Sequence, residues 1–166
     1  MNQIIFLFLI CMNALDPSPD LASIREKYRE ASNSEQTTKK LFDELSVIGK
    51  NDNQTLVAYK GAVTTLMSKY AEGFGDKKSF FKEGREWLEH AVENDQASVE
   101  IRCIRLSVQE NVPKITGYTK NIEEDKKFIL DNFASMTDNG AKSFVKGYTT
   151  QSAAFSEDEK QLFSGI

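Results

Sequence analysis

The sequence predicts an all-α protein in which antiparallel helix hairpins stack as a small superhelix or a helical bundle. After Pro19, apolar residues recur at intervals of three and four, which is the period of a helix, and the alternation typical of strands is almost absent. Capping residues, glycines and prolines divide the chain into segments of helical length. These two patterns account for the chain without any strand.

The length and charge of the chain limit its organisation and its partners. With 166 residues, it is long enough for one domain with its own core, which we place at residues 15–166. Its 25 acidic and 21 basic residues give a net charge of −4, so no overall positive field would draw it to nucleic acid. We therefore expect no nucleic-acid partner.

The N-terminal residues have the pattern of a signal peptide. An unbroken apolar run extends from Ile4 to Met12, and the first charged side chain is that of Asp16. The run is shorter than the ~20 residues that a membrane span needs. We expect residues 1–14 to be removed and the protein to be exported to the periplasm or the extracellular space, without stable membrane insertion. The alternative is a buried N-terminal strand or helix turn.

The first two helices are expected at the start of the domain. Ser18 and Pro19 are a cap and a first-turn residue for the first helix, which continues through residues 20–31. Ser34 caps the second helix, and Gly49 is expected to end it.

The third and fourth helices show clear apolar stripes. The third is expected over residues 53–72 and is stopped by the glycines of "GFGD". The fourth is expected over residues 76–94, and the residues expected toward the core are Phe80, Gly84, Trp87, Leu88 and Ala91.

Four helices are expected in the remaining chain. The fifth spans residues 98–112 and is closed by Pro113, after which a loop leads to Asn121, the cap of the sixth. The last two are expected over residues 138–151 and 156–163. Ser156 and Glu159 have the spacing of a capping box.

The centre of the chain carries residues that resemble a tetratricopeptide repeat. Gly84 and Ala91 stand where the second helix of that motif has small residues, and Leu88 stands where it has a large apolar one. The sequence Glu93-Asn94-Asp95-Gln96 takes the place of the motif's Glu-Leu-Asp-Pro turn, and "YKGAV", with Gly61, is similar to the first helix.

This resemblance covers residues 56–106 and implies stacked antiparallel helix pairs. The whole chain also resembles small exported bacterial helical proteins that carry no assigned function. Families with this architecture bind unrelated partners, so the resemblance implies no particular ligand.

The fifth helix presents the best candidate for a binding site. At about 100° per residue, two opposite sides are apolar, which predicts that this helix lies between two neighbours. The third side carries Arg102, Arg105 and Gln109, and two guanidiniums one turn apart can hold a carboxylate or a phosphate. Tyr118 and the 113–121 loop are candidates to complete this site. The alternative is that Arg102 and Arg105 pair with Asp or Glu of an adjoining helix.

The residues most suited to catalysis lack the partners that chemistry requires. His90 has Glu86 and Glu93 on its helix, but this set matches neither a helix-bundle metal site nor a zinc site. Cys103 has no base beside it in sequence and is expected to be buried. We predict no catalytic residue, no metal and no cofactor.

Two hypotheses of function remain open. The first is a non-enzymatic exported module that binds a protein or peptide on its helices, with exposed aromatic side chains available for recognition. The second is a small-ligand, anion-binding protein or an enzyme without a known motif, with its site near Arg102, Arg105 and residues 113–121. Most aromatic residues are expected in the core in either case.

Overall fold

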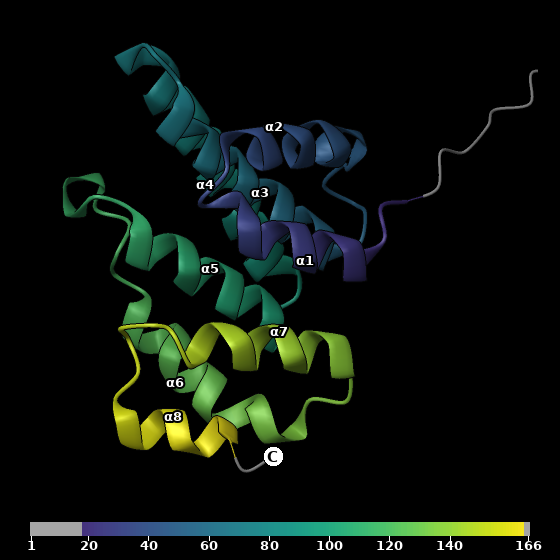
Figure 1. Cartoon of the computed structure of the whole chain (residues 1–166), viewed down its shortest axis with the longest axis vertical. Coiled ribbons are helices and arrows are strands. Elements are labelled where there is room, and N and C mark those ends of the chain that lie inside the picture. The colour runs from purple at the N-terminus through teal and green to yellow at the C-terminus, as the bar shows by residue number, and fades with distance from the viewer. Residues whose placement is uncertain (1–17, 165–166) are drawn as a thin grey trace, which may run out of the picture.

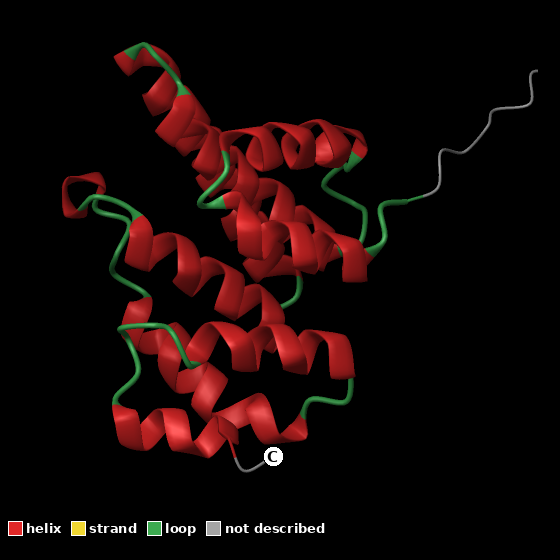
Figure 2. Ribbon diagram, in the orientation of Figure 1, coloured by secondary structure: helices red, strands yellow, loops and turns green. Residues whose placement is uncertain are grey.

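The computed structural model describes residues 18–164, whose secondary structure is entirely helical (Figures 1 and 2). The all-α prediction is confirmed. The expected signal peptide at residues 1–14 lies outside the described residues and stays a prediction. The helices are α1 (Leu21–Ala31), α2 (Glu35–Glu44), α3 (Gln54–Tyr70), α4 (Phe74–Asn94), α5 (Val99–Asn111), α6 (Ile122–Asn132), α7 (Asn139–Thr149) and α8 (Glu157–Ser164). Three short 3-10 turns are η1 (Leu45–Val47), η2 (Lys114–Thr116) and η3 (Phe133–Ser135).

Helix α5 is the centre of the fold. In Figure 1, α1 to α4 lie on one side of it and α6 to α8 on the other, and α5 packs against α3, α4, α6 and α7. This confirms the prediction that α5 lies between neighbours. Both of its predicted apolar sides are buried, namely Ile101, Ile104 and Val108 on one and Val99, Cys103 and Leu106 on the other.

Helices α3 and α4 form an antiparallel hairpin with unusually close backbones. A Cβ built on Gly84 would lie 2.5 Å from the Gly61 carbonyl oxygen and 2.6 Å from the Thr65 nitrogen. A Cβ on Gly61 would lie 2.6 Å from the Leu88 nitrogen. Both glycines are therefore needed for this crossing.

Through Gly84, α4 packs closely on the helix before it rather than on the helix after it. Gly84 approaches α3, the helix before it, and α4 packs far more extensively against α3 than against α5. The tetratricopeptide resemblance itself stays a prediction.

Capping side chains stand at several of the predicted helix starts. The side chains of Ser34, Asn53 and Ser98 accept hydrogen bonds from the first turns of α2, α3 and α5. Ser156 and Glu159 form the expected capping box, because each accepts a hydrogen bond from the other's backbone N–H. These helix starts were readable because a capping side chain acts on a backbone group only two or three residues away.

The predicted start of α1 and the predicted end of α2 are wrong. Asp20, not Ser18, caps α1, since its carboxylate accepts a hydrogen bond from the Ser23 N–H. Helix α2 ends at Glu44 and continues as η1, after which Ile48 is extended and buried. Gly49 is therefore not a left-handed terminator; among the described residues, positive φ occurs only at Gly117.

The "GFGD" segment starts a helix as well as ending one. Helix α3 ends at Tyr70, and Gly73 is the N-cap of α4. Helix α4 therefore begins at Phe74, two residues before the expected start at residue 76. Glycine is tolerated at this cap position, where the backbone is extended. Phe74 is consequently the first residue of α4, at the tip of the hairpin, which extends beyond the other helices at the upper left of Figure 1.

Candidate functional site

The predicted arginine stripe on α5 is part of a buried ion cluster. Arg105 donates through Nε and Nη2 to the two oxygens of Asp125 on α6, at 2.7 and 2.6 Å, and through Nη1 to Glu89 on α4, at 2.9 Å. Burial by itself would lower the pKa of Arg105, but the hydrogen bonds and charges of Asp125 and Glu89 outweigh burial and raise it. The guanidinium thus stays charged.

Arg102 joins the same cluster at its edge. Its Nη1 donates to Asp125 at 3.0 Å and to Glu124 at 2.7 Å. The guanidinium carbon also lies 5.1 Å from the centre of the Phe128 ring. Both arginines are therefore bound by carboxylates of neighbouring helices, which is the ion-pair alternative raised by the sequence.

Tyr118 contacts this cluster, whereas Gln109 takes no part in it. The Tyr118 hydroxyl donates to Glu89, and burial, followed by that hydrogen bond, raises the pKa of the tyrosine. Gln109 is 1% exposed, and neither its amide nitrogen nor its amide oxygen has a hydrogen-bond partner among the described residues. The structure brings Arg102, Arg105 and Tyr118 together through shared carboxylates, whereas Gln109 makes no polar contact with them.

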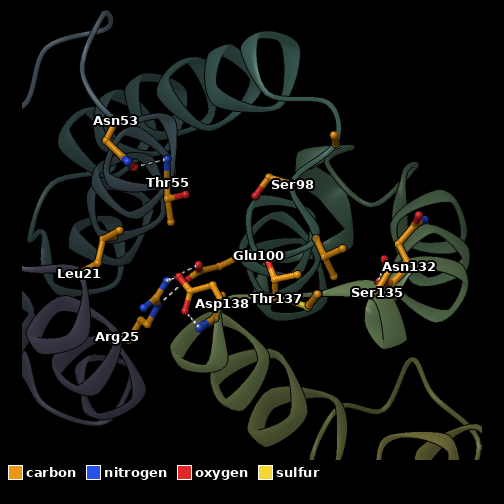
Figure 3. Close-up of a pocket in the computed structure, with 14 residues that line it drawn as sticks. Leu21, Arg25, Asn53, Thr55, Ser98, Glu100, Asn132, Ser135, Thr137 and Asp138 are labelled. Carbon is orange, nitrogen blue, oxygen red and sulfur yellow. Dashed lines mark hydrogen bonds and ion pairs between the residues drawn. The ribbon is translucent and has the colours of Figure 1, made fainter. Parts of the chain in front are cut away.

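A polar pocket of about 370 Å³ lies elsewhere, around Arg25 of α1 (Figure 3). The Arg25 guanidinium donates to both oxygens of Glu100 on α5, at 2.7 and 2.8 Å, and to Asp138, the cap of α7, at 3.1 Å. Tyr59 of α3 also donates to Glu100, at 2.8 Å. The hydrogen bonds at this pocket therefore join four helices, α1, α3, α5 and α7.

The chemistry of this pocket favours a structural role. The N-terminal residues of α3, α5 and α7 line it, as Asn53, Ser98 and Asp138 show in Figure 3. Helix N-termini carry partial positive charge, which stabilises the buried Glu100. The charge of Arg25 is already balanced by two carboxylates, and that pairing raises the pKa of Arg25. Sequence reasoning missed this junction because its members are up to 113 residues apart.

His90 is hydrogen-bonded within the chain, and Cys103 is buried. His90 Nε2 lies 3.0 Å from the Lys50 carbonyl oxygen, and Asn94 lies beside the same ring. Cys103 is fully buried, and burial raises its pKa well above the ordinary value of a thiol. Across residues 18–164, no group of three or more His, Cys, Asp or Glu side chains is arranged to hold a metal ion.

The most exposed apolar side chains lie on another surface. Phe74 is 84% exposed at the start of α4, and Ile115 is 95% exposed in the 113–121 loop. The same two elements meet where the Phe81 and Tyr118 rings pack edge to face with centroids 6.0 Å apart, and the guanidinium carbon of Arg85 lies 5.7 Å from the Tyr118 ring. The loop therefore packs against α4, and each of these two elements carries one of the exposed apolar residues.

We call this surface the α4 face. It consists of Phe74, Lys78, Phe81 and Arg85 of α4 and of Lys114 and Ile115 of the loop. The buried Tyr118 ring contacts Phe81 and Arg85 and so connects the loop to α4. Part of this face was predictable from the sequence. Phe74 and Phe81 are seven residues apart and therefore share one side of a helix. The expectation that "GFGD" ends a helix placed Phe74 outside α4 and hid this relation.

Comparison with known proteins adds no relative. The chain has no significant match to a protein-family model, to a curated protein or to a solved structure. Within the described part of the chain, no helix is both long and apolar enough to cross a membrane.

Proposed function

We propose that this protein is a non-enzymatic helical module that binds a protein or peptide partner on the α4 face. The observation that carries the proposal is the exposure of Phe74 and Ile115 on the two elements that the Phe81–Tyr118 contact joins. Large apolar side chains grouped beside aromatic and arginine side chains are typical of recognition surfaces. Phe74 lies about 10 Å along the helix from Phe81, which gives a strip long enough for several residues of a partner.

The rigid support beneath this face favours the same function. Tyr118 is held by Glu89, which is held in turn by the buried Arg105. The ion cluster on α5 therefore fixes the base of the 113–121 loop, while Ile115 at its tip stays exposed. A loop positioned by a rigid scaffold is a common arrangement for binding.

The test compares how well two double variants capture a partner. Each variant lacks two exposed apolar side chains, but in different places. Phe74→Ser with Ile115→Ser removes the two on the α4 face. Val47→Ser with Leu162→Ser is the matched control, because these side chains are 63% and 61% exposed and lie outside the α4 face. Neither pair should change stability by more than about 1 kcal/mol, since exposed substitutions usually cost within ±0.5 kcal/mol each.

The purified chain is crosslinked to proteins in an extract of its own cells. We expect the variant Phe74→Ser with Ile115→Ser to lose the crosslinked partner and the control Val47→Ser with Leu162→Ser to keep it. Equal capture by both pairs, or equal loss, would contradict the proposal.

We further propose that the module acts outside the cytoplasm, in the periplasm or the extracellular space. The support is the apolar run from Ile4 to Met12, which has the pattern of a signal peptide. Intact mass of the secreted protein tests this, with a mature chain that starts near Leu15 as the expected result.

A further inference from the structure

The charges of α4 are sorted by side. Taking about 100° per residue, Lys78, Arg85 and Lys82 lie on the same side as Phe74 and Phe81. Asp76 and Glu83 lie on the other side, and Glu86 lies next to Lys82 at the boundary between the two sides. The side that meets the 113–121 loop is therefore the cationic one.

Three cations of the α4 face have no carboxylate partner within the described residues. Lys78, Arg85 and Lys114 are exposed and form no ion pair there, whereas Lys82 has only a distant pair with Glu86, at 3.8 Å. Glu89 lies on the same side of α4, but its carboxylate is already bound by Arg105 and Tyr118. The face thus combines exposed apolar side chains with positive charge that the chain itself does not neutralise.

We infer that the α4 face binds an acidic segment of a partner protein that carries at least one large apolar side chain. The inference rests on the proposed function and specifies its partner class. Carboxylates of the partner pair with Lys78, Arg85 and Lys114, and its apolar side chain packs between Phe74 and Ile115. The Arg85 guanidinium is already held near the Tyr118 ring, and this placement prepares it to donate hydrogen bonds to a carboxylate.

Two other occupants fit the observations less well. An anionic membrane would meet the tip of the hairpin first, where Glu72 and Asp76 stand two residues to either side of Phe74 in the sequence. An acidic segment can instead place its carboxylates further along α4, at Lys78 and Arg85. A second copy of the chain offers an acidic first turn on α8 beside the exposed Leu162, but such a head-to-tail contact would not close into a dimer.

The probes are three synthetic amphipathic helical peptides with the same apolar residues and a polar side made of glutamate, glutamine or lysine. Binding to the purified chain is measured by fluorescence anisotropy at ~0.01 M and ~1 M salt, between which the Debye length falls from about 30 to about 3 Å. The glutamate peptide should bind at least about tenfold more tightly than the other two at low salt and lose this advantage at high salt.

Charge-reversal variants locate the site. Lys78→Glu with Arg85→Glu should weaken binding of the glutamate peptide by about tenfold or more. Lys40→Glu with Lys127→Glu is the control, since both lysines are exposed on other helices, α2 and α6. Circular dichroism establishes that all variants keep their helices.

Each other outcome overturns the inference. Equal or tighter binding of the lysine or glutamine peptide, or no binding of any peptide, removes the preference for acid. Binding to vesicles of phosphatidylcholine with phosphatidylserine, but not to the peptides, assigns the face to a membrane. Self-association that is lost in Lys78→Glu with Arg85→Glu assigns it to a second copy. If partner capture still depends on Phe74 and Ile115, the interaction module stands although the acidic partner does not.

Discussion

The α3–α4 junction is packed backbone against backbone, whereas the α5–α6 junction is built around buried charge. At the first, Gly61 and Gly84 leave no room for a Cβ. At the second, Asp125 is fully buried and binds two arginines. The first junction is therefore sensitive to added atoms and the second to removed partners.

Removal of the central carboxylate should give the largest effect. Asp125→Ala leaves Arg105, which is 3% exposed, without its main acceptor, and breaking one side of a buried pair costs about 3–5 kcal/mol. Urea unfolding measures this loss. Asp131→Ala on the same helix is the control, because its pair with Lys127 is exposed and worth only about 0.3–0.5 kcal/mol. Similar losses for both variants would show that burial of the charge is not decisive.

Filling the glycine crossing should give the next largest effect. Gly84→Leu places a side chain where even a Cβ meets backbone at 2.5 Å, and we expect a loss near 3 kcal/mol, at the upper end of overpacking. Thermal unfolding measures it. Gly75→Leu, in the same helix, is the control, because a Cβ there has nothing within 4 Å. A neutral Gly84→Leu would mean that α3 and α4 do not cross as described.

The turn that connects the two junctions should be the least sensitive. The Ser98 N–H donates to the Asp95 carbonyl oxygen at 3.4 Å, which places Gln96 at the second position of a β-turn. Proline is favoured at that position, so Gln96→Pro should change stability by less than about 1 kcal/mol. Thermal unfolding beside the parent chain measures the change. A large loss would remove the agreement with the proline of the tetratricopeptide turn.

Local signals made most helices predictable. Ser34, Asn53 and Ser98 act on backbone groups two or three residues away, so their roles can be read from the sequence. The errors arose where two local signals compete. Both Ser18 and Asp20 can cap a helix, and the glycines of residues 73–75 can either end one helix or begin the next.

The partners of charged residues were not predictable from the sequence. The burial of α5 and its arginine stripe followed from periodicity, but any of 25 acidic residues could have paired with Arg105. Asp125, 20 residues away, is selected only by how α6 folds back onto α5. The α4 face was missed for the same reason, since the packing of residues 113–121 beside Phe81 is a long-range contact.

The Glu100 carboxylate also bears on how the chain folds as it is synthesised. Its partners Arg25 and Tyr59 lie 75 and 41 residues earlier in the chain. Burying a carboxylate without partners costs several kcal/mol of free energy. Packing of α5 into the core therefore has a low desolvation cost only when α1 and α3 are already in place to bind Glu100. Helix α1 is synthesised before α5. Arg25 therefore gains its main acceptor, Glu100, only after 75 further residues have been added. The contacts of Arg25 and Tyr59 with Glu100 can therefore form only after α5 has been synthesised, so this part of the core is completed late.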